Sequence, residues 1–152
     1  MKILAIDPGT TQSAWLILNS KNKCIVAYGK LDNERIYQEV LLPYISDYDY
    51  VAIEMIASYG MPVGKEVFET CLWIGRFLQK SLDLEKETKL IYRRDIKLWL
   101  CNSPKAKDGN IRAALIDIFG KSGTKKTPGI TYGISKDIWA ALAIAAFIAK
   151  IN

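Results

Sequence analysis

Short apolar runs separated by turn residues predict three successive strands at the start of the chain. Residues 1–19 contain an apolar strand, a Pro-Gly turn and a second strand, and residues 22–30 follow a Ser-Lys-Asn turn as a third. A helix is expected over about residues 33–45. The apolar run at residues 49–53 then predicts a short buried strand that ends at Glu54.

Helical spacing dominates the second half of the chain. A loop over residues 56–64 precedes a long helix predicted over 65–82, which carries two apolar stripes. One stripe contains Phe68 and Leu72 and the other contains Trp73 and Phe77, so one face can enter the core and the other can meet a second subunit. The later elements are expected as a strand over 90–92, helices over 95–100 and 108–119, a basic loop over 121–133, and an apolar helix capped by Ser135 that ends near Ala149.

This order of elements predicts an α/β fold in which helices pack on a mixed, five-stranded sheet. The length of 152 residues fits a single domain over residues 1–152. No repeat, low-complexity tract or linker interrupts it. The most apolar stretch, residues 138–148, is too short to span a membrane.

Composition excludes several kinds of chemistry. The chain has no histidine, which rules out Ser-His-Asp and Cys-His nucleophile systems and histidine-ligated zinc. Its three cysteines lie far apart and form no CxxC pair, which argues against a disulfide framework or a thiolate zinc cluster and suits a reducing compartment.

The distribution of charge points to a polyanionic partner. Residues 88–126 carry ten Lys or Arg against three Asp, whereas the rest of the chain is slightly acidic, and the net charge is +5. Such asymmetry is typical of nucleic-acid binding, although a solvated basic face without a partner explains the charge alone equally well.

Three carboxylates stand where burial makes a lone charge costly. Asp7 and Glu54 each end an apolar strand, and Asp137 begins an apolar helix. If the two strands are parallel neighbours, their carboxylates meet at one end of the sheet. Singly, each residue has a structural explanation, in a turn, a salt bridge or a helix dipole. Together they predict a site for Mg²⁺ or Mn²⁺, two of which can hydrolyse a phosphodiester without a histidine base.

The same residues carry a family resemblance. ILAIDPGTT before a strand, VAIE before a loop and long helix, and DIWAALAIA in a terminal helix resemble the RuvC-like Holliday junction resolvases of the ribonuclease H-like superfamily, nearly end to end. The resemblance implies that Asp7, Glu54 and Asp137 bind two Mg²⁺ ions. It also implies a homodimer that nicks two opposed strands of a four-way junction. The expected location is the cytoplasm of a bacterial or phage-infected cell, and the chain could be a phage or prophage member of the family.

One position departs from the family pattern. The last motif usually has a second Asp, or a His, three residues after its first Asp, and this chain has Ala140 there. The departure bears on the number of metal ions held. Asp108 is the nearest conceivable substitute, but its surroundings indicate a helix N-terminus.

Candidate DNA-binding residues share a positive charge and a position near the predicted site. They are Arg93, Arg94, Lys97, Lys105, Lys107, Arg112, Lys125 and Lys126. The resemblance puts Lys107 near the scissile phosphate, which makes it a catalytic candidate. Tyr59, in the loop after Glu54, is a candidate for stacking on an opened base or else packs against its own loop.

Rival functions remain open from the sequence alone. A nuclease of the same fold could act on flaps, forks or RNA–DNA hybrids, and a protein with Ala140 could bind branched DNA without cutting it. IDPGTT also resembles the phosphate-binding turn of sugar kinases and actin-like ATPases. Those enzymes need two such domains to enclose ATP, so this interpretation ranks below the nucleases.

Overall fold

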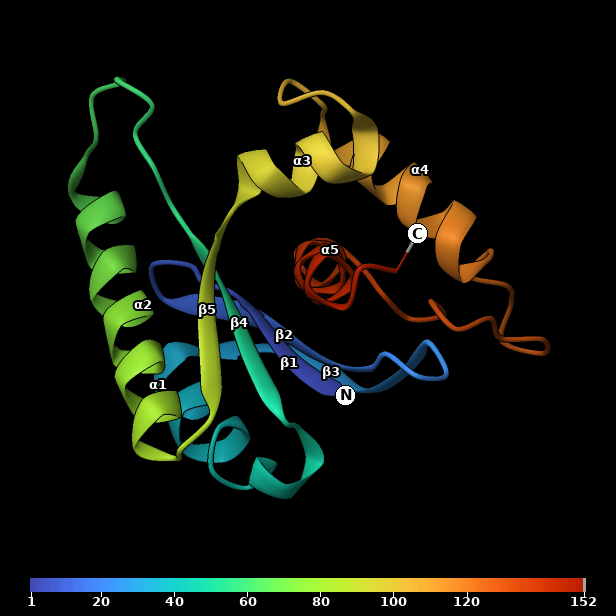
Figure 1. The fold of residues 1–152 in the computed structure, drawn as a ribbon, viewed down its shortest axis with the longest axis horizontal. Helices are drawn as coiled ribbons and strands as arrows, with labels where there is room; N and C mark the ends of the chain where they lie inside the picture. Colours follow the sequence, from blue (N-terminus) through green and yellow to red (C-terminus); the bar gives the residue numbers. More distant parts are fainter. Residues whose placement is uncertain (152) are drawn as a thin grey trace.

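A five-stranded mixed sheet lies at the centre of the protein, in the order β3-β2-β1-β4-β5 (Figure 1). The computed structural model describes residues 1–151. The strands are β1 (Lys2–Asp7), β2 (Gln12–Asn19), β3 (Cys24–Asp32), β4 (Tyr50–Met55) and β5 (Glu87–Tyr92). The first three pair antiparallel, whereas β4 lies parallel to β1 and β5 parallel to β4. The predicted mixed sheet is therefore confirmed.

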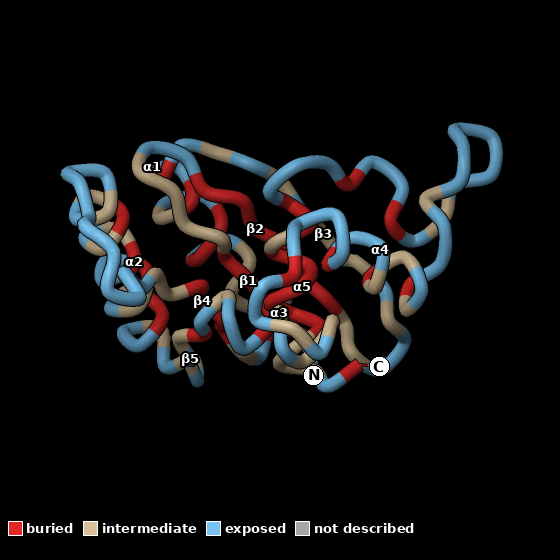
Figure 2. Tube along the Cα trace, turned by 90° about the horizontal axis from the view of Figure 1, so that it is seen from above, coloured by how far each residue is buried: buried red, intermediate tan, exposed pale blue. Residues whose placement is uncertain are grey.

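Helices cover both faces of this sheet (Figure 1). The helices are α1 (Asn33–Arg35), α2 (Lys65–Asp83), α3 (Arg93–Cys101), α4 (Asp108–Phe119) and α5 (Ile138–Ala149). One hydrophobic cluster joins α3, α4 and α5 to the sheet, and a second joins α2 and the segment after α1 to the opposite face. Figure 2 shows the buried residues concentrated in the inner strands and α5. Among residues 1–151, no helix is both long and apolar enough to cross a membrane.

The alternation of side chains along β1 assigns each residue to a face. Ile3 and Ala5 pack in the cluster with α5, whereas Leu4 and Ile6 pack in the cluster with α2. Because both faces are covered, the central strands are apolar throughout rather than alternately polar. This alternation directs Asp7 to the same face as Ala5, the face covered by α5.

The predicted helix over residues 33–45 is wrong in its continuity. Only Asn33–Arg35 is α-helical, and a π-helical turn (Ile36–Val40) and a 3-10 turn (Ile45–Asp47) follow. The wider turn brings three neighbouring apolar side chains into the core, since Ile36, Val40 and Leu41 are all buried. The Tyr48 hydroxyl donates a hydrogen bond to the Leu41 carbonyl and closes the turn.

Two further expectations concern helix ends and faces. The prediction that Ser135 caps the last helix with its side chain is wrong, since α5 begins at Ile138 and only the Ser135 carbonyl accepts from its N–H. In α2 the structure selects the face for the core: Phe77 is buried, whereas Phe68 and Leu72 stay 61% and 69% exposed.

Candidate metal centre and nucleic-acid surface

Asp7 and Glu54 come together because their strands are parallel neighbours. Ile6 of β1 pairs with Ile53 of β4, so the next residue of each strand lies at the same end of the sheet. Ala5 and Ala52 both pack in the cluster with α5, and the alternation therefore turns both carboxylates toward that helix. The predicted meeting of these two strand ends is confirmed.

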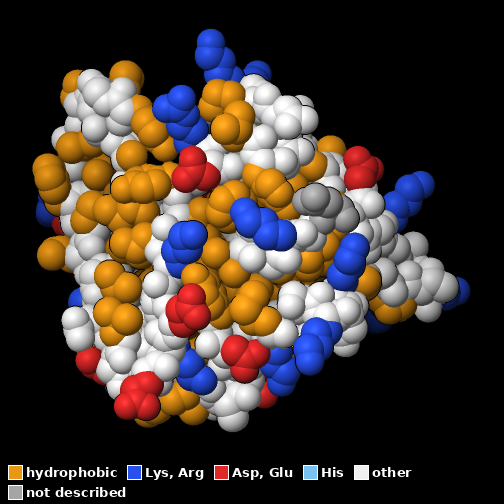
Figure 3. Space-filling model, viewed as in Figure 1, with side chains coloured by type: hydrophobic (Ala, Val, Ile, Leu, Met, Phe, Trp, Pro, Cys, Tyr) orange, Lys and Arg blue, Asp and Glu red, His pale blue; other side chains and the backbone are white. Residues whose placement is uncertain are grey.

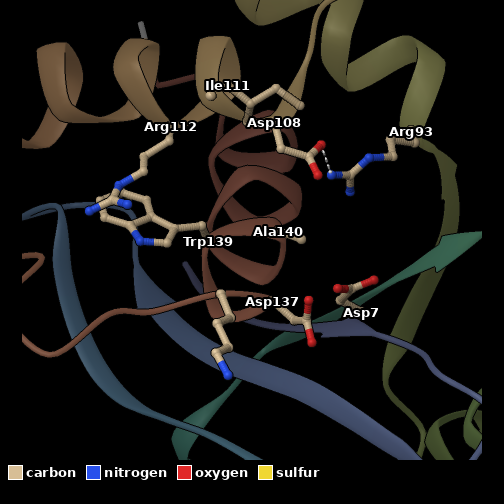
Figure 4. A pocket seen from close by; sticks show the side chains of 10 residues that line it. Asp7, Arg93, Asp108, Ile111, Arg112, Asp137, Trp139 and Ala140 are labelled. Carbon is tan, nitrogen blue, oxygen red and sulfur yellow. Dashed lines mark hydrogen bonds and ion pairs between the residues drawn. The ribbon is translucent and has the colours of Figure 1, made fainter.

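Asp137 reaches the same place from the start of α5. Asp7 and Asp137 line one cavity of about 330 Å³, together with Ala140 and the beginning of α4. Figure 4 shows the two aspartates on the same side of this cavity, with Ala140 one turn further along α5. Asp108 lines the cavity from the α4 side.

Arg93 joins two of the acidic residues. Its Nη1 donates to Glu54 Oε2 at 3.2 Å, and its Nη2 donates to Asp108 Oδ1 at 2.6 Å. The Glu54 side chain is only 9% exposed, so this guanidinium is a close partner of a buried charge. Figure 4 shows the contact between Arg93 and Asp108 at the edge of the cavity.

Lys30 is the other cation in the site. Its Nζ lies 2.5 Å from Asp137 Oδ2 and reaches the site from β3, on the far side of the sheet from β5. Both groups of this ion pair are partly exposed, with 39% and 50% of the side-chain surface accessible. A pair this exposed contributes little to stability.

The electrostatics of the strand ends favour a bound cation. Burial, followed by the charge of Glu54, raises the pKa of Asp7 to about 8. Burial also raises the pKa of Glu54, although Arg93 opposes this effect. The pKa of Asp108 is lowered by its hydrogen bond from Arg93. The positive charges of the protein near Asp7 are therefore too weak to keep its carboxyl group ionised at neutral pH.

A hydrogen-bonded turn holds Asp7 in place. After β1, the Gly9 N–H donates to Ser13 Oγ at 3.1 Å, and Asn33 Nδ2 donates to the Gly9 carbonyl at 2.9 Å. Ser13 Oγ in turn donates to Asn33 Oδ1. A side chain at Gly9 would collide with the Gln12 carbonyl, so the turn requires glycine.

The donor set fits Mg²⁺ or Mn²⁺ by its chemistry. Asp7, Glu54 and Asp137 supply oxygen ligands, which hard divalent ions prefer. The pKa of Asp7 is raised by burial and by the charge of Glu54, and a bound cation would favour the ionised form of Asp7. In the part of the chain described, no three carboxylate or thiol side chains already converge as a ligand cluster. Glu54 instead faces Arg93, and Asp137 faces Lys30.

The basic residues divide into two groups. Arg112 lies at the cavity with its guanidinium carbon 5.1 Å from the centre of the Trp139 ring. Lys107 is exposed and directly precedes Asp108 at the start of α4. The other predicted cations of this region are Arg94, Lys97 and Lys105, on α3 and the loop that follows it.

Lys125 and Lys126 lie apart, in a loop narrowed by a bridge between Gly123 and Pro128. Both lysines are exposed. Tyr59 is 59% exposed, which contradicts the interpretation in which it packs against its own loop. Trp15 and Trp139 are both buried, as expected of core residues.

Sequence reasoning missed the partners of the carboxylates. Arg93 was expected on the DNA surface, but the structure gives it Glu54 and Asp108 as partners. Lys30 was not singled out, since nothing in the local sequence relates it to Asp137. The signal for Arg93 was its place directly after a strand that could lie beside the strand of Glu54.

Comparisons with known proteins agree with the geometry. No protein-family model and no curated protein sequence matches this chain. The structure resembles Thermus thermophilus RuvC with a TM-score of 0.76 and 19% identity, over 99% of this chain and 96% of that one. The same protein in complex with a Holliday junction substrate gives 0.76 and 17%, over 99% and 95%.

A viral protein has the same arrangement at lower similarity. The Fowlpox virus resolvase, in complex with substrate Holliday junction DNA, gives a TM-score of 0.51 and 14% identity, over 97% of this chain and 98% of that one. At such identities the likeness concerns the fold. The strand order, the helices on both faces and these matches show that the chain has the ribonuclease H-like fold of the RuvC Holliday junction resolvases.

Proposed function

We propose that this protein is a metal-dependent endonuclease that resolves Holliday junctions by paired nicks in opposed strands. The observation that supports the proposal is the position of Asp7, which lies beside Glu54 at the ends of two parallel strands and lines one cavity with Asp137, in a resolvase-type fold. Two of the solved structures that resemble this chain hold Holliday junction DNA, which supports a branched substrate.

Asp7, Glu54 and Asp137 would hold Mg²⁺ or Mn²⁺. The resemblance predicts two ions for this site. A bound ion would supply an activated water and stabilise the leaving oxygen of the phosphodiester. The Gly9–Ser13–Asn33 network fixes the backbone after Asp7, so that this carboxylate keeps its position when the ion is exchanged.

The cations around the cavity would bind the DNA backbone. Lys107 and Arg112 stand on either side of the first turn of α4, where a scissile phosphate would reach the carboxylates. Arg94, Lys97 and Lys105 extend this surface, and Lys125 and Lys126 would contact another arm. Tyr59 would stack on a base that is opened at the crossover.

A homodimer would place two such sites on one junction. Phe68, Leu72 and Leu82 leave an apolar strip on the outer side of α2. Figure 3 shows hydrophobic side chains gathered over α2 and the loop before it. Exposed apolar surface of this kind is typical of protein interfaces.

The test is cleavage of an end-labelled synthetic four-way junction in Mg²⁺, Mn²⁺ and EDTA, beside linear duplex, a flap, a fork and an RNA–DNA hybrid. The proposal expects metal-dependent symmetric nicks in the junction alone. Faster cutting of another substrate would assign a same-fold nuclease instead. Tight junction binding without cleavage in either metal would indicate a binding protein, which Ala140 and the two ion pairs favour as the second candidate.

A further inference from the structure

Arg93 is fixed beside Glu54 by the sheet rather than by its own flexible side chain. It is the first residue of α3 and directly follows β5, whose Tyr92 pairs with Met55 at the end of β4. The backbone therefore brings the guanidinium to the end of the sheet where Glu54 lies, one residue before the end of β4. Only 32% of the Arg93 side chain is exposed, which is low for a residue expected on a DNA-binding surface.

The two hydrogen bonds of Arg93 use both of its terminal nitrogens. Nη1 donates to Glu54 at 3.2 Å and Nη2 donates to Asp108 at 2.6 Å. A guanidinium is planar and presents its donors in a fixed fork, so a single side chain can link the two carboxylates. Glu54 is thereby linked through Arg93 to Asp108 at the start of α4.

Charge balance then limits how many metal ions the site can hold. Asp7, Glu54, Asp108 and Asp137 carry four negative charges when all are ionised. Lys30 and Arg93 contribute two positive charges through their ion pairs. Arg112 and Lys136 line the same cavity, so the cations of the chain already offset most of this negative charge. A second divalent ion would therefore leave an excess of positive charge in a partly buried site before any substrate arrives.

The residues that line the cavity also offer no ligand for a second ion. Ala140 lines the cavity one helical turn after Asp137 and offers no ligand there. Asp108, which lines the cavity from α4, is already bound by Arg93. Neither position therefore supplies a free carboxylate for an additional ion.

We propose that Arg93 is a positioning residue of this site: it holds Glu54 and Asp108 and takes the place of one divalent ion, so that each chain binds one. This inference rests on the proposed metal-dependent nuclease and replaces the expectation of two ions with one ion and a built-in guanidinium.

The experiment counts Mn²⁺ ions bound per chain in the absence of DNA, by isothermal titration calorimetry with electron paramagnetic resonance of free Mn²⁺. The wild-type protein should bind one ion. Arg93→Gln releases Glu54 and Asp108 and should raise the number to two. Arg93→Lys keeps the charge and should restore one ion. Arg35→Gln, which removes a surface arginine paired with Glu39, is the matched control and should change nothing.

Two Mn²⁺ ions bound to the wild-type chain with similar affinity would overturn the inference, and so would no bound ion. An unchanged count in Arg93→Gln would overturn it as well. Thermal melts show whether this variant is folded, and if it is not, the wild-type and Arg93→Lys counts decide. The ion count needs no DNA, so the two proposals can fail separately. One bound ion without junction cleavage would contradict only the proposed function, and junction cleavage with two bound ions would contradict only this inference.

Discussion

Ile6 pairs with Ile53 across two parallel strands, so Asp7 and Glu54 leave the sheet next to one another on the face covered by α5. Two carboxylates in such a place repel each other and lose hydration. Arg93 pairs with Glu54, but ionisation of Asp7 beside it remains unfavourable without a further cation. The same two carboxylates should therefore lower the stability of the metal-free protein and attract divalent ions, and both effects can be measured.

The stability of the metal-free protein should fall as pH rises from about 4 to about 8. The pKa of Asp7 is raised from 3.8 to about 8 in the folded protein, so within this window the unfolded chain has released a proton that the folded chain retains. For one such group the slope is at most about 1.4 kcal/mol per pH unit, and it vanishes above the folded pKa. Urea unfolding in EDTA at a series of pH values measures it.

Asp7→Asn should remove most of this slope, because an amide has no proton to release. Asp117→Asn, at an exposed position of α4, is the control and should keep the slope of the wild-type protein. Equal slopes for wild-type and Asp7→Asn proteins would show that Asp7 titrates normally in the fold.

Divalent ions should stabilise the wild-type protein and not the Asp7→Asn variant. An ion that binds only the folded chain raises the free energy of unfolding by about 2.7 kcal/mol at a concentration of 100 times its Kd. Thermal melts in EDTA, Mg²⁺ and Mn²⁺ measure the effect. A shift of equal size in both proteins would place the ion elsewhere.

Asp7→Asn should also abolish cleavage while junction binding persists. We expect a loss of more than about 100-fold in the nicking rate, since removal of a mere outer partner of a metal ligand already costs about 10–100-fold. Cleavage and gel-shift assays with the same junction separate the two effects. Undiminished nicking would remove Asp7 from the mechanism.

The lysine pair in the loop before α5 should contribute to affinity by neutralising DNA phosphates. Lys125→Ala with Lys126→Ala should weaken junction binding and reduce the slope of log K against log salt by roughly 1.8, at about 0.9 for each phosphate that a lysine no longer neutralises. Lys21→Ala with Lys23→Ala removes the same charge from the β2–β3 turn, at the end of the sheet away from Asp7. Equal effects of both double variants would indicate a general charge effect.

The exposed strip of α2 should carry the dimer contact. Leu72→Glu should weaken self-association by at least about 100-fold, because burial of each leucine side chain stabilises by roughly 1.5–3 kcal/mol and a dimer buries two. Sedimentation analysis over a range of concentrations measures it. Leu42→Glu alters another half-exposed leucine, outside α2, and should leave the association unchanged. A wild-type protein that stays monomeric at all concentrations would refute the contact.

The local sequence pattern does not predict which face of α2 enters the core. Both stripes of this helix are apolar, so their periodicity predicts a helix but does not rank the faces. The sheet decides, because Phe77 meets Ile6 and Ile53 in one cluster while Leu72 points away from it. In the same way, Ile36, Val40 and Leu41 all enter the core from a π-helical turn that no helical spacing predicts.

The sequence by itself determined the strands, their mixed order and the acidic residues at their ends, because apolar runs, turn residues and a period of two are local properties of the chain. Only the tertiary structure decided the partners of these acids. Arg93 lies 39 positions from Glu54, and Lys30 lies 107 positions from Asp137. Their ion pairs depend on which strand edges and helix ends meet, and that is set by the packing of α5 and β5 on the sheet rather than by any neighbouring residue.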